Sequence, residues 1–308
     1  MVAAAQSGIV TLAFVAALGA YAVGQEPTFR AEIDLASFGV TITDRAGIYL
    51  TDLTRDDFEV LEDGVPQAVR YFARGEASVG AFAPELHLGL LFDTSGSMVD
   101  DIGLARTAAV RFLNTFQEAR DMALVDFASE VRIARYGQND FPRMVERIRT
   151  RRPSGETAMY DALGVYLDQA SDDEGRTILV LYTDGGDTRS SISFKDVMTL
   201  VQASDVTIYV IGLLDHQSTR NRLEQRTRLT QLATASGGEA FFPSGMRDVE
   251  RAYDKVVSQI RAQYSLAFAS TNTKRDGTWR KVEIRVKRPG LRGVRVQTRQ
   301  GYFAPYQP

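Results

Sequence analysis

The chain has 308 residues, of which 44% are hydrophobic and 24% are charged. This is the composition of a folded protein of about two domains, which excludes disordered and collagen-like chains. Cysteine is absent and there are two histidines, so disulfides, thiolate metal sites, thiol nucleophiles and histidine-rich metal cages are excluded. The formal net charge is −3, yet residues 271–301 are strongly basic and the rest of the chain is therefore acidic.

The N-terminal residues 1–25 carry no charge and are nearly all apolar between positions 9 and 23. Ala20 and Ala22 form the small-x-small pattern that signal peptidase accepts. The apolar stretch is short for a membrane span, which needs about 20 residues. We expect residues 1–25 to be a signal peptide or membrane anchor, with a buried helix as the alternative. The protein is thus expected to be exported, to the periplasm, the cell surface or the medium.

Residues 26–82 have the alternating pattern of β structure. Polar and apolar residues alternate over 30–35, and β-branched residues fill 40–43. Asp63 and Gly64 separate two further alternating runs, which is a signal for a two-residue hairpin. This region is predicted to be the first part of a β-sandwich.

Residues 83–260 alternate short apolar runs with segments of helical spacing. The expected strands are 86–92, 123–127, 177–182 and 206–211, and the expected helices are near 104–118, 157–170, 193–203, 222–235 and 246–262. This alternation predicts an α/β domain with a doubly wound, mostly parallel sheet that helices cover on both faces.

Residues 261–308 return to β structure. Residues 281–287 alternate regularly, Pro289 and Gly290 form a turn, and 294–296 alternate again. Each β region is small for an independent core, but together they could form a sandwich of about seven strands. The sequence therefore predicts an α/β domain inserted into a β-sandwich that the N- and C-terminal segments build.

Polar residues follow the predicted strands of the α/β domain. Asp93, Ser95 and Ser97 alternate along a short loop after the first apolar run. Thr157 opens a helix, and Asp184 follows another apolar run. Ligands of open parallel sheets bind beyond the carboxyl ends of the strands, where these residues are expected to meet. Carboxylate and hydroxyl oxygens suit Mg²⁺, although such residues also commonly cap helices.

Three motifs resemble those of the von Willebrand factor type A domain. They are Asp-x-Ser-x-Ser at 93–97, Gly-x-Thr at 155–157 and Thr-Asp-Gly at 183–185. The resemblance covers about 83–260 and implies a Rossmann-like fold with a metal-ion-dependent adhesion site. Carried over to this chain, the metal ligands, direct or through water, are Asp93, Ser95, Ser97, Thr157 and Asp184. The ion is expected to be Mg²⁺, with Mn²⁺ or Ca²⁺ as alternatives.

The flanking regions are similar to exported bacterial proteins of this group. The similarity rests on Leu53–Gly64, with its Asp-Gly turn, and on Arg-x-Gly-Tyr-Phe at 299–303. The sequence departs from the family at Glu156, where glycine is common before the threonine. This acid bears on ligand preference rather than on metal binding.

The expected function is a metal-dependent protein-binding module, for adhesion or scaffolding. Neutral hydroxyls and two carboxylates would leave the ion with an open position, which an Asp or Glu of a protein partner can complete. Glu156 and Asp187 add acids to the same edge, so the face is expected to be negative without a cation. No small-molecule substrate is expected. The basic residues at 271–301 are interpreted as a solvated hairpin face, which makes nucleic acid an unlikely partner.

Enzymes are the alternative class. Asp93 could belong to an aspartic protease, but Ser95 stands where that loop has glycine, and 98–118 has a helical pattern. Asp93 could also accept a phosphoryl group with Asp184 binding Mg²⁺. That chemistry needs a second acid at Ser95 and a nearby lysine, and Lys195 is the one lysine in 83–254. A metal-free scaffold is the third class, and His216 is interpreted as an exposed loop residue.

Overall fold

The computed structural model describes residues 35–75, 84–116, 118–171 and 173–307. The predicted signal peptide or anchor at 1–25 lies outside the described residues. Within them, no helix has the length and apolar character needed to cross a membrane.

A six-stranded sheet forms the centre of the α/β region, in the order β10-β9-β8-β5-β6-β7. The strands are β5 (Leu86–Asp93), β6 (Asp121–Phe127), β7 (Val131–Gly137), β8 (Arg176–Thr183), β9 (Thr207–Gly212) and β10 (Ala240–Phe241). β7 is antiparallel to its neighbour and the other strands are parallel, as the doubly wound prediction requires. The hairpin strand β7 was not predicted.

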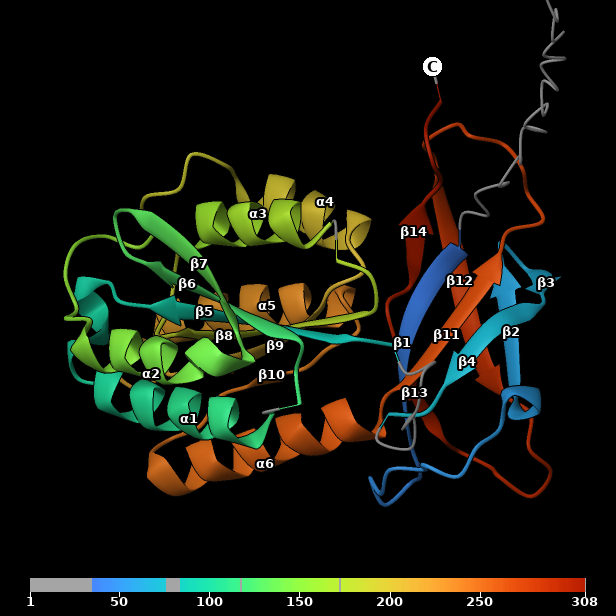
Figure 1. The fold of residues 1–308 in the computed structure, drawn as a ribbon, viewed down its shortest axis with the longest axis horizontal. Coiled ribbons are helices and arrows are strands. Elements are labelled where there is room, and N and C mark those ends of the chain that lie inside the picture. The colour runs from blue at the N-terminus through green and yellow to red at the C-terminus, as the bar shows by residue number, and fades with distance from the viewer. Residues whose placement is uncertain (1–34, 76–83, 117, 172, 308) are drawn as a thin grey trace, which may run out of the picture. The chain divides into compact units, whose positions relative to one another are not determined.

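Helices cover both faces of this sheet (Figure 1). α1 (Ile102–Thr115), α2 (Phe141–Thr150) and α6 (Met246–Ala262) share one apolar core with the strands. α3 (Met159–Ala170), α4 (Phe194–Ala203) and α5 (Thr219–Ala235) share the core on the opposite face. Successive residues of β5 point to opposite faces of the sheet: Leu90 packs in the core with α1, α2 and α6, and Leu91 packs in the core with α3, α4 and α5. The described residues also contain three short 3-10 helices: η1 (Arg55–Asp57), η2 (Gly96–Val99) and η3 (Gln138–Asp140).

The terminal segments form two antiparallel four-stranded sheets, β13-β1-β11-β4 and β14-β12-β2-β3. Their strands are β1 (Leu35–Thr43), β2 (Phe58–Glu62), β3 (Val65–Gln67), β4 (Val69–Ala73), β11 (Tyr264–Ala269), β12 (Trp279–Val286), β13 (Arg295–Gln297) and β14 (Gly301–Phe303). Each sheet mixes strands from both ends of the chain, because β1 pairs with β11 and β2 pairs with β12. The predicted fold class is therefore confirmed, and the described residues form eight such strands where about seven were expected.

One apolar core joins the two small sheets. Phe38 of β1 stacks on Phe268 of β11, with ring centroids 5.9 Å apart, and Val60 of β2 belongs to the same buried cluster. The predicted turn at Asp63 and Gly64 connects β2 to β3, and both residues have positive φ, 48° and 84°. That conformation is typical of the type I′ hairpin, which the Asp-Gly pair favours.

Candidate functional site

The candidate site lies in the loops that follow β5 and β8. Asp93 is the last residue of β5, and Asp184 follows Thr183, the last residue of β8. The two strands are neighbours, with Phe92 opposite Tyr182 in the register. Parallel pairing therefore brings the two carboxylates to the same edge of the sheet, as the sequence predicted.

Hydrogen bonds connect four of the five predicted ligands. The Ser95 backbone N–H donates to Asp93 Oδ1 at 2.9 Å, and Ser95 Oγ lies 3.1 Å from Ser97 Oγ. Ser97 Oγ in turn donates to Asp184 Oδ1 at 2.9 Å. The four residues thus form a continuous series of polar contacts, in which Ser97 is exposed and the others are buried.

Thr183 is a contributor that sequence analysis missed. Its hydroxyl donates to Asp93 Oδ2 at 2.7 Å and accepts from the backbone N–H of Gly185 at 3.2 Å. Both carboxylate oxygens of Asp93 therefore accept a hydrogen bond, one from its own loop and one from the neighbouring strand. The signal was present in Thr-Asp-Gly at 183–185, where the threonine was treated only as part of a motif.

Thr157 reaches the site by way of its loop. Gly96 N–H donates to the Gly155 carbonyl, and Ser154 N–H donates to the Thr94 carbonyl, both at 2.9 Å. Thr157 is buried, and its N–H donates to Thr188 Oγ1 at 2.9 Å. Among the described residues, no hydrogen bond joins its hydroxyl to the other four, so its role as a ligand stays a prediction.

The electrostatics of the site favour a cation. Burial raises the pKa of Asp93 to about 7, against the opposing hydrogen bonds from Ser95 and Thr183. Burial also raises the pKa of Asp184, and nearby Asp101 adds to that rise. Two buried carboxylates this close are costly to charge together, and a divalent ion between them would remove the cost.

The donor set fits a hard divalent ion such as Mg²⁺, which binds through few carboxylates and keeps several waters. The predicted site offers two carboxylates and three hydroxyls. Within the described residues, no group of three or more His, Cys, Asp or Glu side chains is placed to hold a metal ion. Any ion held here would therefore depend on hydroxyl and water ligands beside the two carboxylates.

The acids around the site differ in what they contact. Asp187 accepts from the Tyr160 N–H at 2.9 Å and so caps the start of α3. Glu156 is exposed and lies 3.5 Å from Arg189. Arg189 therefore offsets part of the negative charge at this edge, whereas Asp187 keeps its charge. His216 Nε2 lies 3.6 Å from Asp101 Oδ1, which brings this loop histidine near the site.

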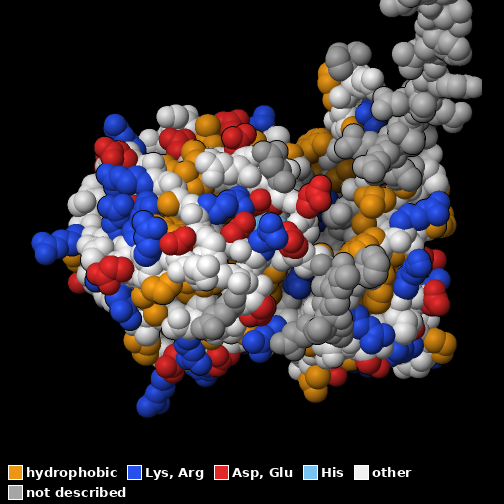
Figure 2. Space-filling model, viewed as in Figure 1, with side chains coloured by type: hydrophobic (Ala, Val, Ile, Leu, Met, Phe, Trp, Pro, Cys, Tyr) orange, Lys and Arg blue, Asp and Glu red, His pale blue; other side chains and the backbone are white. Residues whose placement is uncertain are grey.

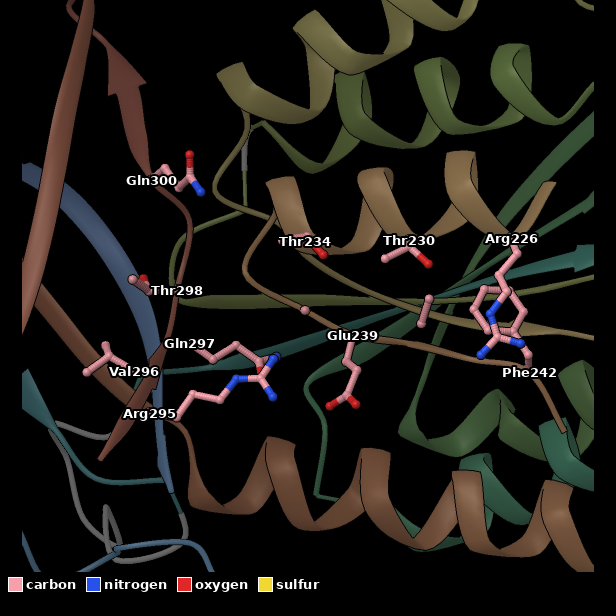
Figure 3. Close-up of a pocket in the computed structure, with 12 residues that line it drawn as sticks. Arg226, Thr230, Thr234, Glu239, Phe242, Arg295, Val296, Gln297, Thr298 and Gln300 are labelled. Carbon is pink, nitrogen blue, oxygen red and sulfur yellow. The ribbon is translucent and has the colours of Figure 1, made fainter. Parts of the chain in front are cut away.

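A cavity of about 490 Å³ lies elsewhere in the molecule, between α5, β10 and β13 (Figure 3). Arg295 and Gln297 extend from β13 toward Glu239, and Arg226 lies over the ring of Phe242. None of the five predicted metal ligands lines this cavity. The cavity is therefore separate from the loops after β5 and β8.

Comparison with known proteins places the α/β region in a family. The family model of the von Willebrand factor type A (VWA) domain matches residues 87–255, more than half of the chain. The chain belongs to this family. The matched residues contain the six-stranded sheet from β5 to β10, apart from Leu86, and all three motifs of the candidate site. A search of curated proteins found no match.

Several solved structures are similar to this VWA protein. A von Willebrand factor type A protein from Catenulispora acidiphila shares 13% identity, with 91% of this chain and 76% of that chain covered and a TM-score of 0.49. The vWF domain of the type V pili tip protein Mfa5 from Porphyromonas gingivalis also shares 13% identity, with 58% of this chain and 96% of that chain covered and a TM-score of 0.49. A D319A mutant of the PilB minor pilin from Streptococcus sanguinis shares 14%, with a TM-score of 0.48. Here 60% of this chain is covered, and the match spans 63% of the PilB chain.

Proposed function

We propose that this VWA protein is a metal-dependent protein-binding module that captures an acidic residue of its partner, in adhesion or scaffolding. Mg²⁺, or Mn²⁺ or Ca²⁺ in its place, would be held by Asp93, Ser95, Ser97, Thr157 and Asp184. The observation that supports this most is the series of polar contacts from Asp93 through Ser95 and Ser97 to Asp184. It sets hard oxygen donors from two loops within hydrogen-bond distance of one another.

The charge balance of these ligands explains why such an ion would take an anionic partner. Two carboxylates offset the charge of a divalent ion only if both are ionised, and neutral hydroxyls supply the other donors. An incoming Asp or Glu adds a hard oxygen ligand and further negative charge, which the ion favours. Ser97 is the exposed member of the series, so the partner would approach from its side.

The enzyme alternatives are weaker on the same geometry. A nucleophilic carboxylate must reach its substrate, whereas Asp93 is fully buried and both of its oxygens accept hydrogen bonds. An aspartic protease needs two carboxylates that share a proton directly. Here Ser95 and Ser97 stand between Asp93 and Asp184. We therefore propose a binding protein without catalytic activity, exported if residues 1–25 act as predicted.

Calorimetric titration with Mg²⁺ tests the metal site. We expect one ion per chain with micromolar to millimolar affinity, since Mg²⁺ dehydrates reluctantly. Asp93→Ala should abolish this binding. Asp254→Ala is the matched control, because it removes an exposed carboxylate of α6 instead. Equal binding by wild type and Asp93→Ala would refute the assignment.

A further inference from the structure

Five of the arginines between positions 132 and 152 lie in elements next to the candidate site. They lie on β7, on α2 and directly after α2, and we call them the arginine patch: Arg132, Arg147, Arg149, Arg151 and Arg152. Figure 2 shows Lys and Arg side chains gathered around β7 and α2, at the left of the view. No residue of the patch is a predicted metal ligand.

A buried carboxylate holds three of these side chains. Asp126 is 1% exposed, and Arg147 Nε donates to its Oδ1 at 2.7 Å. Arg151 Nε lies 3.0 Å from Asp126 Oδ2, and Arg132 lies 4.0 Å from the same oxygen. Three guanidinium groups that share one carboxylate leave an excess of positive charge. Because this anchor already orders them, less side-chain entropy is lost when they bind an anion.

Two members of the patch have no partner within the described chain. Arg149 and Arg152 are exposed, and neither forms an ion pair or a hydrogen bond through its guanidinium there. Arg132 has one further acidic neighbour, Glu130. Positive charge on this surface is therefore available to an incoming anion.

The patch is continuous with the loops of the candidate site. Asp126 lies opposite Phe92 in the register, one position before Asp93. Only Pro153 separates Arg152 from Ser154, whose N–H donates to the Thr94 carbonyl. Arg106 of α1 donates to the Arg151 carbonyl, which ties the end of α2 to the helix that follows the Asp93 loop. A ligand bound at the site can thus extend directly onto the arginines.

We propose that the arginine patch is a second contact surface for an acidic segment of the protein partner. This inference rests on the proposed function: one carboxylate of the segment is directed at the metal, and the next carboxylates contact the patch. Guanidinium groups bind carboxylates through paired, charge-assisted hydrogen bonds. Exposed Glu156 and buried Asp184 add negative charge at the site itself, where they would repel a long phosphate backbone. A short acidic peptide fits this charge pattern better than nucleic acid does.

Two fluorescein-labelled peptides with blocked ends test the proposal by fluorescence anisotropy in Mg²⁺. One carries a single Asp flanked by glycines, and the other carries the same Asp flanked by glutamates. We expect the wild type to bind the glutamate peptide about tenfold more tightly, equivalent to about 1.4 kcal/mol. The double variant Arg149→Glu/Arg152→Glu should lose this gain, and the gain should shrink with salt. Arg70→Glu/Arg292→Glu is the control, since it makes the same charge change at two exposed positions, one on β4 and one between β12 and β13.

The possible results separate the patch from the metal site. The proposal for the patch would be overturned if Arg149→Glu/Arg152→Glu bound the glutamate peptide as tightly as the wild type, or if the control lost as much affinity. It would also be overturned if the wild type did not bind the glutamate peptide up to about 1 mM. Duplex DNA that binds the wild type as tightly as the glutamate peptide would overturn the choice of an acidic peptide. If binding survives chelation and Asp93→Ala but is lost in Arg149→Glu/Arg152→Glu, the patch is supported and the proposed metal function fails.

Discussion

Arg299 Nη2 lies 2.6 Å from Asp205 Oδ1 and so joins the C-terminal segment to the connection between α4 and β9. The same guanidinium donates to the Ser204 carbonyl at 2.7 Å and to the Ser37 carbonyl at 2.6 Å. It also lies 4.6 Å from the ring centroid of Phe38 in β1. One buried side chain thus connects the VWA region to both ends of the chain that build the small sheets.

Replacing this side chain should destabilise the protein. Arg299→Ala leaves two carbonyls without their donor and opens space beside Phe38, so we expect the free energy of unfolding to fall by about 2–4 kcal/mol. Urea denaturation measures it. The control Arg285→Ala removes an exposed arginine near Glu283 and Glu59 and should leave stability nearly unchanged. Similar stability of the two variants would contradict the role given to Arg299.

The hairpin turn at Gly64 gives a prediction about backbone conformation. Gly64 has φ of 84°, and no neighbouring atom lies within 4 Å of the place that a Cβ would take, so conformation alone sets the cost of a substitution. Gly64→Ala should lower the free energy of unfolding by about 1 kcal/mol. Gly103→Ala makes the same change in open space on α1 and should raise stability by about 0.5–1 kcal/mol. Thermal and urea unfolding measure the stability of both variants relative to the wild type. If Gly64→Ala stabilised the protein, the conformational argument for this turn would be wrong.

The pKa of Asp93 predicts how stability depends on pH when no metal is bound. The folded carboxyl has a pKa raised from 3.8 to about 7, so between those values the folded state keeps a proton that the unfolded state has lost. Stability should therefore fall as pH rises from about 4 to 7, by up to about 1.4 kcal/mol per pH unit from this group. Asp93→Asn should lack this part of the slope. Mg²⁺ should restore stability above pH 7, where the carboxylate is ionised.

Urea titrations at pH 5 and pH 8, with chelator and then with Mg²⁺, measure this dependence. Asp254→Asn is the control, since that carboxylate is 62% exposed on the surface. The decisive quantity is the difference between the slopes of the wild type and Asp93→Asn. Equal slopes would show that Asp93 titrates normally in the folded protein.

Much of the fold was predictable because its signals are local. The Asp63–Gly64 turn and the buried runs of β5 and β8 are encoded by neighbouring residues, and parallel strand ends bring Asp93 and Asp184 together as expected. The sequence analysis did not predict the strand and the helix in the region 131–150. β7 is half-buried, and its arginines at 132 and 135 interrupt the apolar pattern of a strand. α2 (Phe141–Thr150) does carry apolar residues at helical spacing, at 141, 144, 145 and 148, but this signal was overlooked among its four charged residues.

The arginine patch could not be predicted for a physical reason. Its members are spread from position 132 to 152, and Asp126, which contacts three of them, is the one charged residue of the predicted strand 123–127. The contact by which Asp187 caps α3, through the Tyr160 N–H, likewise joins residues 27 positions apart. Such partners become visible only when tertiary structure brings distant residues together.

Glu156, the family departure noted in the sequence, provides the last prediction. Its side chain is 57% exposed and 3.5 Å from Arg189, so it adds negative charge beside the site without belonging to the series of polar contacts. Glu156→Gln should therefore raise affinity for the glutamate peptide about two- to fivefold at low salt, because one repulsive charge is lost and Arg189 is released. Calorimetric Mg²⁺ affinity should stay the same. Glu250→Gln, at an equally exposed position of α6, should change neither value. A loss of Mg²⁺ binding in Glu156→Gln would instead place this carboxylate among the metal ligands.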